Sequence, residues 1–136
     1  MKIRALLLIL FFIINIFSVN AEENTTQPAV SQSITQPQNI NFENCTKMFA
    51  INKEKLFFLT LSAVNANKFI VDEIQTSNGY IIFSQANNKY LATVAGIDAT
   101  NSILKITPCN NIYIFPPGIL LGMYKYIELN LNTEIK

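Results

Sequence analysis

The spacing of apolar residues after Cys45 predicts a folded domain that opens with a strand and a helix. Lys47–Ile51 is a short apolar run that suits a strand. From Lys53 to about Lys68, apolar side chains recur at helical spacing and form a broad stripe. Asn52, directly before this stretch, is a suitable N-cap because its side-chain oxygen can accept a hydrogen bond from the first helical turn.

Four β-prone runs follow, separated by turn signals, and a second helix ends the pattern. Asn78-Gly79 supplies the positive φ that a tight hairpin needs, and Asp98 is expected to cap the turn that it forms with Asn101. Pro116-Pro117 suits the start of a last helix that ends near Asn132. Proline lacks a backbone N–H, and the N–H groups of the first helical turn have no partner within the helix, so nothing is lost there. The strands are expected at Phe69–Gln75, Tyr80–Ser84, Lys89–Ile97 and Ser102–Thr107. The pattern therefore predicts a single α+β, two-layer domain at residues 45–132, with an antiparallel sheet of about five strands packed by two helices in the order strand, helix, four-strand meander, helix.

The N-terminal 21 residues have the layout of a secretory signal peptide. Lys2 and Arg4 precede an apolar run from Ala5 to Phe17, and side chains of small or modest size lead to Ala21. An uncleaved membrane anchor is the alternative, but the run is shorter than the roughly 20 residues that a spanning helix needs. We therefore expect export to the periplasm or the extracellular space, cleavage after Ala21, and no stable membrane span afterwards. Residues 22–44 are polar and lack any period, so they are predicted to be a disordered linker.

Composition narrows the chemistry of the exported chain. Of the 136 residues 14% are charged, none is His, and the only Arg lies in the predicted signal. Cleavage would leave eight Lys against nine acidic residues, a net charge of −1, which disfavours nucleic acid and anionic membrane surfaces as partners. Without His, the commonest general base and metal ligand is missing. We therefore expect a protein that is not an enzyme and that uses no cofactor or metal.

The predicted order of elements from about Lys47 to Leu131 resembles the helix-grip modules of bacterial envelope proteins such as the BamC family. The resemblance rests on that order alone. The cysteine at the cleavage point of BamC-type lipoproteins is missing, since the first cysteine here is Cys45. The resemblance implies a non-enzymatic module of the cell envelope that acts through protein partners.

Cys45 and Cys109 are the only two cysteines of the chain. In an exported protein an even number of cysteines is typical of disulfides, so a Cys45–Cys109 bridge is predicted. Two unpaired buried thiols are the alternative. Redox motifs usually keep their cysteines closer together, and a metal site needs more ligands than two cysteines supply.

Two motifs resemble catalytic ones but have simpler explanations. Ser102 and Lys105 match the Ser-x-x-Lys pattern of penicillin-binding enzymes, yet on a strand these positions point to opposite faces. The adjacent carboxylates Asp72 and Glu73 are expected to face opposite ways for the same reason. In that arrangement they could not act together on one substrate atom.

Tyrosines supply the candidate interface. Tyr80, Tyr90, Tyr124 and Tyr126 each combine a ring that can be buried with a hydroxyl that can stay in water, as at protein interfaces. Tyrosines are equally ordinary on half-buried strands, which is the competing interpretation. The favoured function is a non-catalytic macromolecular-interaction or structural module of the cell envelope with a protein partner.

The alternative function is a carrier of a small apolar ligand, held between sheet and helix. Such a pocket would be lined by Phe57, Phe58, Phe83 and Met123. A fully packed core is the competing expectation, because a domain of this size has little apolar material to spare.

Overall fold

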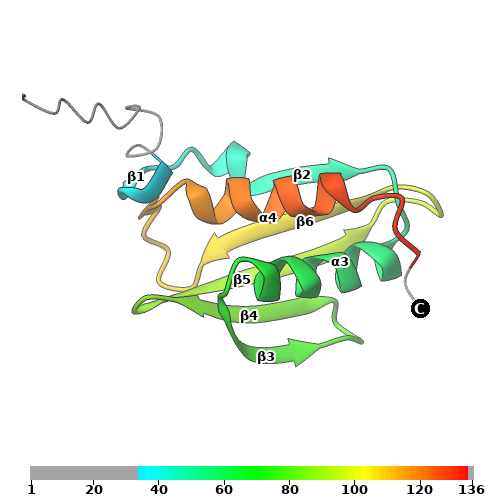
Figure 1. Ribbon diagram of the computed structural model, residues 1–136, viewed down its shortest axis with the longest axis horizontal. Coiled ribbons are helices and arrows are strands. Elements are labelled where there is room, and N and C mark those ends of the chain that lie inside the picture. The colour runs from blue at the N-terminus through cyan, green and yellow to red at the C-terminus, as the bar shows by residue number, and fades with distance from the viewer. Residues whose placement is uncertain (1–33, 135–136) are drawn as a thin grey trace, which may run out of the picture.

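The computed structural model describes residues 34–134, so the predicted signal peptide and residues 22–33 of the predicted linker lie outside the described residues. Ten elements follow one another along this part of the chain (Figure 1). They are β1 (Gln38–Asn39), the 3-10 helix η2 (Phe42–Cys45), β2 (Thr46–Phe49), α3 (Lys53–Ala66), β3 (Ile70–Gln75), β4 (Tyr80–Gln85), β5 (Asn88–Gly96), β6 (Ser102–Pro108), β7 (Ile114–Phe115) and α4 (Gly118–Leu129).

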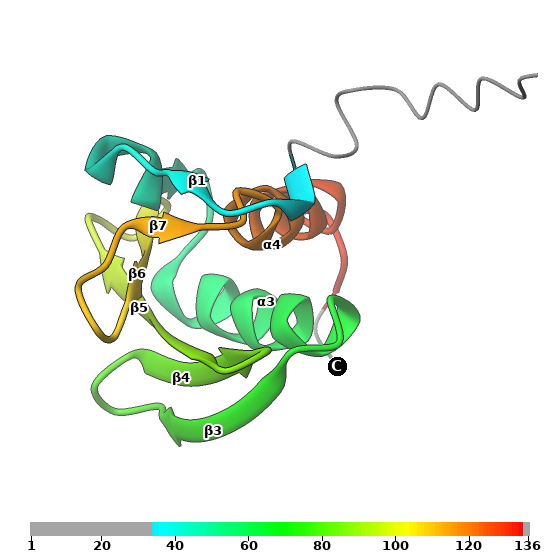
Figure 2. The ribbon, with the colours of Figure 1, turned by 90° about the vertical axis from the view of Figure 1, so that its left-hand side faces the viewer.

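Five strands form one antiparallel sheet in the order β2-β6-β5-β4-β3, which confirms the predicted α+β class and the meander from β3 to β6. Because β2 pairs with the last strand of the meander, β2 and β3 become the two edges of the sheet. The sheet curves around α3, and α4 lies beside α3 on the same side (Figure 2). The short strands β1 and β7 pair with each other as a separate two-stranded sheet.

The core fills the space between the concave face of the sheet and the two helices. Alternate residues of β4, β5 and β6 point inward, as expected for strands that have solvent on one side. Each helix contributes a stripe of buried apolar residues to the same core. Fully buried side chains from these elements include Leu56, Val64, Ile81, Phe83, Tyr90, Leu104, Ile106, Met123 and Ile127.

A row of four aromatic rings runs through one end of the core. Phe69 and Phe83 stack with centroids 5.4 Å apart, and Phe83 stacks on Tyr90 at 5.5 Å. The edge of Phe115 completes the row at 5.4 Å from Tyr90. The Tyr90 ring is fully buried, and its hydroxyl has no hydrogen-bond partner among residues 34–134.

Local sequence signals fix the starts of both helices and the first hairpin. Asn52 caps α3 as predicted, because its Oδ1 accepts a hydrogen bond from the N–H of Lys55 at 2.8 Å. The helix α4 starts at Gly118, directly after the two prolines. Gly79 adopts φ +72° in the turn between β3 and β4, the conformation that its Asn-Gly pair predicts.

Gly122 lets the two helices approach each other closely. A Cβ atom at this position of α4 would lie 2.4 Å from Oδ1 of Asn67, the residue that ends α3. The Asn67 amide is held there by donating to the Ala63 carbonyl at 2.8 Å. The contact brings α4 close to the C-terminal end of α3.

Part of the predicted linker belongs to the folded domain. Gln38–Asn39 pair with Ile114–Phe115, and Ile40 is buried in the core. The prediction of a disordered linker over 22–44 is therefore wrong from residue 38 onward. The side chains of β1 are polar and exposed, and the contacts that attach this stretch include backbone pairing, the buried Ile40 and the Phe42 ring against Tyr113. None of these leaves a periodic signal in the sequence.

The predicted disulfide is also wrong, since Cys45 and Cys109 are not bonded. Thr46 pairs with Lys105, so Cys45 lies level with the next residue of β6, Ile106. Cys109 follows three residues later, about 10 Å further along at about 3.3 Å per residue. A disulfide spans at most about 7 Å between Cα atoms. The strand register, which residue spacing does not reveal, keeps the two thiols apart.

Candidate functional site

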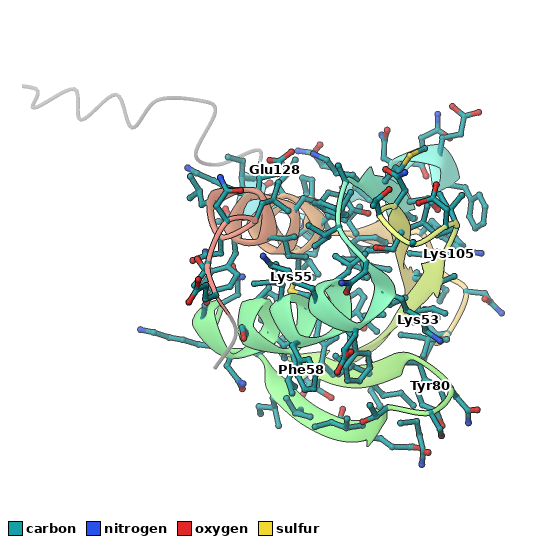
Figure 3. The ribbon with its side chains drawn as sticks, turned by 90° about the vertical axis from the view of Figure 1, so that its right-hand side faces the viewer. Lys53, Lys55, Phe58, Tyr80, Lys105 and Glu128 are labelled. Atoms are coloured by element: carbon teal, nitrogen blue, oxygen red, sulfur yellow. The ribbon has the colours of Figure 1, made fainter. Side chains whose placement is uncertain are left out.

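The four tyrosines predicted as an interface do not form one surface. Tyr90 and Tyr124 are buried, and Tyr126 is half-buried against the core. The interface prediction is therefore wrong for Tyr90, whereas Tyr124 borders the groove described below. Tyr80 lies on the outer face of the sheet, far from the Glu128 end of α4 (Figure 3). Its hydroxyl donates to Glu73 at 2.7 Å. Sequence patterning could not separate these positions, because tyrosine suits cores and surfaces alike.

The four residues predicted to line an apolar pocket are likewise divided. Phe57, Phe83 and Met123 belong to the buried core cluster, whereas Phe58 is 38% exposed on the outer side of α3. Phe57 and Phe58 together border a surface hollow of about 300 Å³ near the start of α3. Phe83 and Met123 are not among its lining residues, which are Lys53, Glu54, Phe57, Phe58 and Thr76.

Ser102 and Lys105, which match the Ser-x-x-Lys pattern, point to opposite faces of β6, as strand geometry predicts. Ser102 is buried on the core face of β6, and its hydroxyl donates to the Ile51 carbonyl at 2.7 Å. Lys105 extends from the opposite face, where its Nζ lies 4.6 Å from the centre of the Phe42 ring. A lysine on the other side of the sheet cannot accept the serine proton.

Asp72 and Glu73 depart from the expected alternation. A β-bulge between Val71 and Glu73 interrupts the register of β3 with β4. Asp72 accepts from the Ser84 hydroxyl, while Glu73 accepts from the hydroxyl of Tyr80, which lies four residues from Ser84 on the same outer face of β4. The prediction that the two carboxylates face opposite ways is therefore wrong. Each carboxylate still has its own hydroxyl partner.

A groove between the edge strand β2 and the helix α4 is the best-formed candidate site. It encloses a hollow of about 470 Å³, bordered on one side by η2 and β2 and on the other by the first turns of α4. Its lining residues are Ile40, Glu43, Asn44, Thr46, Lys47, Pro117, Leu120, Leu121 and Tyr124. No residue of β6 is among them, although β6 is the strand paired to β2. The hollow therefore lies on the free side of β2.

The groove has an apolar floor and a polar rim. Ile40, Leu120 and Tyr124 are buried and form the floor, and Leu121, which is 53% exposed, forms the outer wall. The rim on the strand side is made of exposed or half-buried polar side chains, with Glu43 at the η2 end. Concave sites of this composition are typical of binding sites, in which an apolar surface supplies affinity and a few polar groups supply orientation.

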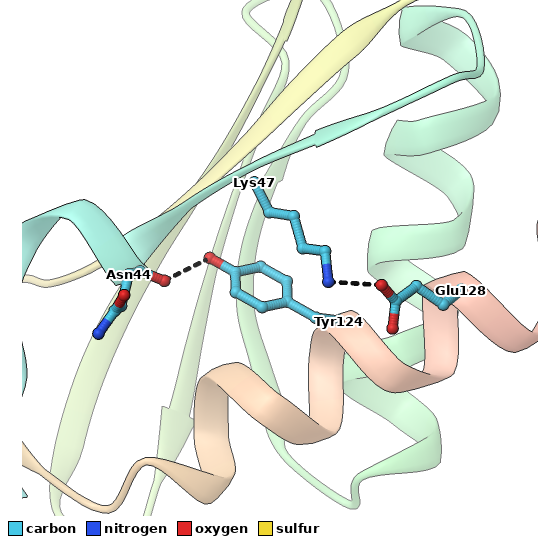
Figure 4. A network of polar contacts seen from close by, with 4 residues as sticks. All are labelled: Asn44, Lys47, Tyr124 and Glu128. Carbon is cyan, nitrogen blue, oxygen red and sulfur yellow. Dashed lines mark hydrogen bonds and ion pairs between the residues drawn. The ribbon is translucent and has the colours of Figure 1, made fainter.

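Polar contacts across the groove hold its two walls in place (Figure 4). The Tyr124 hydroxyl donates to the carbonyl of Asn44 at 3.2 Å, which ties α4 to η2. One turn further along α4, Glu128 forms an ion pair with Lys47 of β2 at 2.5 Å. The Lys47 Nζ also lies 5.4 Å from the centre of the Tyr124 ring, within range of a cation–π interaction. Burial raises the pKa of Tyr124 well above its usual value of about 10, so its hydroxyl remains protonated and able to donate even in moderately alkaline solution.

The described residues contain neither a candidate metal site nor a candidate membrane-spanning helix. Within residues 34–134, no three Cys, Asp or Glu side chains gather where they could hold a metal ion. No helix in the same range combines the length and the apolar character needed to cross a bilayer.

Comparison with known proteins does not add an assignment. No protein-family model matches the chain, and no curated protein matches it.

Sequence reasoning missed the groove because it depends on which strand forms the edge of the sheet. One signal was present in α4. Leu120 belongs to the apolar stripe that faces the core, whereas Leu121 lies beside that stripe and is exposed. An apolar residue next to a helical stripe widens the apolar face, and such widening is one sign of a second contact.

Proposed function

We propose that this chain is an exported, non-catalytic interaction module of the cell envelope, located in the periplasm or outside the cell. In this proposal it binds a protein partner in the groove between β2 and α4. The observation that carries the proposal is the groove itself, with a buried apolar floor, an exposed leucine wall and a polar rim at a free sheet edge.

The rigidity of the groove supports a binding role. The hydrogen bond from Tyr124 to Asn44 and the Lys47–Glu128 ion pair both cross from α4 to the opposite wall. A site that is already formed loses little conformational entropy when a partner binds, which favours affinity. Composition supports the non-catalytic part of the proposal, since the chain contains no His.

Site-specific cross-linking in the host tests the groove. A photoreactive amino acid replaces Leu121 in the outer wall, and a matched control replaces Leu129, which is 75% exposed at the end of the same helix but outside the groove. We expect a discrete protein adduct from position 121 and not from position 129. The captured partner, once purified, should lose binding to a Leu121→Asp variant. Equal adducts from both positions, or none from 121, would contradict the proposal.

Export is tested separately by the intact mass of the protein recovered from its host. We expect a chain that begins at Glu22, as the signal layout predicts. A mass that includes Met1 would contradict cleavage while leaving the groove experiment interpretable.

A further inference from the structure

The pairing of β5 with β6 determines which backbone groups of β6 face β2. In an antiparallel pair, alternate residues of a strand direct their N–H and C=O groups to opposite sides. The N–H of Cys109 donates to the carbonyl of Lys89 at 2.9 Å, so the odd-numbered residues of β6 bond to β5. The even-numbered residues, Ser102 and Leu104, are therefore the ones that bond to β2.

The same alternation leaves backbone groups unpaired on the outer side of β2. The partners of Ser102 and Leu104 are Phe49 and Lys47, so Thr46 and Met48 direct their N–H and C=O groups to the free side. The N–H of Thr46 donates to the Glu43 carbonyl at the end of η2. The carbonyl of Thr46 and both groups of Met48 then remain at an edge where the described chain places no further strand.

The free edge continues from the groove already described. Thr46 and Lys47 line its strand side, and Met48 follows directly with a side chain that is 62% exposed on the outer face. A strand added at this edge would alternate its side chains between the two faces of the sheet. Those on the face of Lys47 would point toward α4 and the hollow beside Leu120 and Tyr124.

The charge of the groove selects among partners. Lys47 and Glu128 neutralise each other, whereas no ion pair engages Glu43 within residues 34–134. The rim therefore carries at its η2 end one carboxylate without an ion-pair partner in the described residues. A basic side chain on the partner would complement it.

We infer that the partner presents an extended segment that pairs with the free edge of β2 as a sixth strand, with an apolar side chain in the hollow and a basic side chain near Glu43. The segment would cover about four to six residues, since β2 itself is four residues long. Strand addition of this kind takes affinity from main-chain hydrogen bonds and specificity from a pocket for alternate side chains. The inference rests on the proposed function, because it names the occupant of the same groove.

A displayed library of random 12-residue peptides, selected against the full exported chain, supplies the probe. We expect enriched peptides to share an apolar residue with a Lys or Arg close by. Their binding should fall at least tenfold with Leu121→Asp and about threefold at low salt with Glu43→Gln. The same peptides should bind a Leu129→Asp control variant as they bind the wild type.

Two measurements test the strand geometry without altering the fold. Peptides N-methylated at single positions should alternate along the chain between full affinity and a loss of about tenfold or more, because alternate amides bond to β2. In hydrogen exchange, the Met48 amide should become protected when peptide binds. The Lys47 amide, already bonded to β6, should not change and serves as an internal control.

The outcomes distinguish this inference from the proposed function. Peptides that depend on Leu121 but show neither alternation nor protection of Met48 would overturn strand addition and leave the groove as a binding site. A selection that yields no peptide dependent on Leu121 would count against both. A dimer of the chain that Leu121→Asp dissociates would show that a second copy, and not a foreign segment, occupies the groove.

Discussion

The unpaired hydroxyl of Tyr90 allows a sharp test of the core. Its ring is fully buried between Phe83 and Phe115, and the oxygen has no hydrogen-bond partner among the described residues. Replacement by phenylalanine keeps both ring contacts and removes only the oxygen. We therefore expect Tyr90→Phe to stabilise the protein.

The expected gain follows from two opposing terms. An unsatisfied buried hydroxyl costs roughly 1 to 3 kcal/mol. Its removal leaves a void of roughly 15 Å³, which costs about 0.4 kcal/mol at about 24 cal/mol per Å³. The free energy of unfolding should rise by about 1 kcal/mol or somewhat more, and the melting temperature of a domain of this size by roughly 4 to 8 °C.

Tyr124→Phe is the matched control. Tyr124 is also buried, at 7% exposure, but its hydroxyl donates to Asn44 at 3.2 Å. Its loss should lower the free energy of unfolding by about 1 kcal/mol. Both variants can be compared by urea unfolding followed through far-UV circular dichroism, which suits a chain without Trp. The two substitutions should shift the midpoint in opposite directions.

A destabilisation of 1 kcal/mol or more by Tyr90→Phe would refute this reasoning. It would mean that the hydroxyl has a partner, such as a buried water molecule, that more than offsets its desolvation. Burial raises the pKa of both tyrosines above the ordinary value of about 10. The unfolded chain then loses these protons first, so stability should be full below pH 10 and should decrease as the pH rises further.

Three further predictions concern turns and thiols. Gly79→Ala should lower the free energy of unfolding by about 2 kcal/mol or more, because the residue has φ +72° and its new Cβ would lie 2.6 Å from the backbone oxygen of Val94. Gly96→Ala is the control in the same urea assay, because its Cβ would make only ordinary contacts, at 3.5 Å and beyond. The pKa of Asp98 is lowered to about 2, first by the Asn101 side chain and then by backbone N–H donors, so Asn101→Ala should raise it toward 3.8 in an NMR titration. Because that pKa is depressed, the stabilisation is present above about pH 4 and should be lost as the pH falls toward 2. A thiol reagent should label the exposed Cys109 in the native protein and the buried Cys45 only after unfolding. If neither cysteine is labelled after unfolding without a reductant, the two thiols form a disulfide.

Much of the fold could be predicted because its signals are local. The Asn52 cap, the Asn-Gly hairpin and the prolines before α4 each act on their own neighbourhood, and all three appear in the structure as expected. The attachment of β1 could not be predicted in this way. Two exposed polar residues and Ile40 join the domain only because β7, some 75 positions later, offers a backbone to pair with.

The failures at the site share one physical cause. Periodicity assigns a residue to a face of an element but not to a place in the sheet. The bulge in β3 turned Asp72 and Glu73 toward one face, and the β2–β6 register separated the two cysteines. Neither the bulge nor the register can be read from spacing along the chain.

The sequence by itself determined the α+β class, the helix starts and the lack of histidine and, after Arg4, of arginine. These features depend on composition and on contacts between residues a few positions apart. Tertiary structure alone decided that β2 is an edge, that α4 lies beside it, and that an apolar floor remains open between them. Those features arise when residues 81 positions apart in the sequence, such as Lys47 and Glu128, come into contact. The free energy of such long-range contacts depends on how side chains from distant segments pack together. Local spacing along the sequence does not reveal this packing.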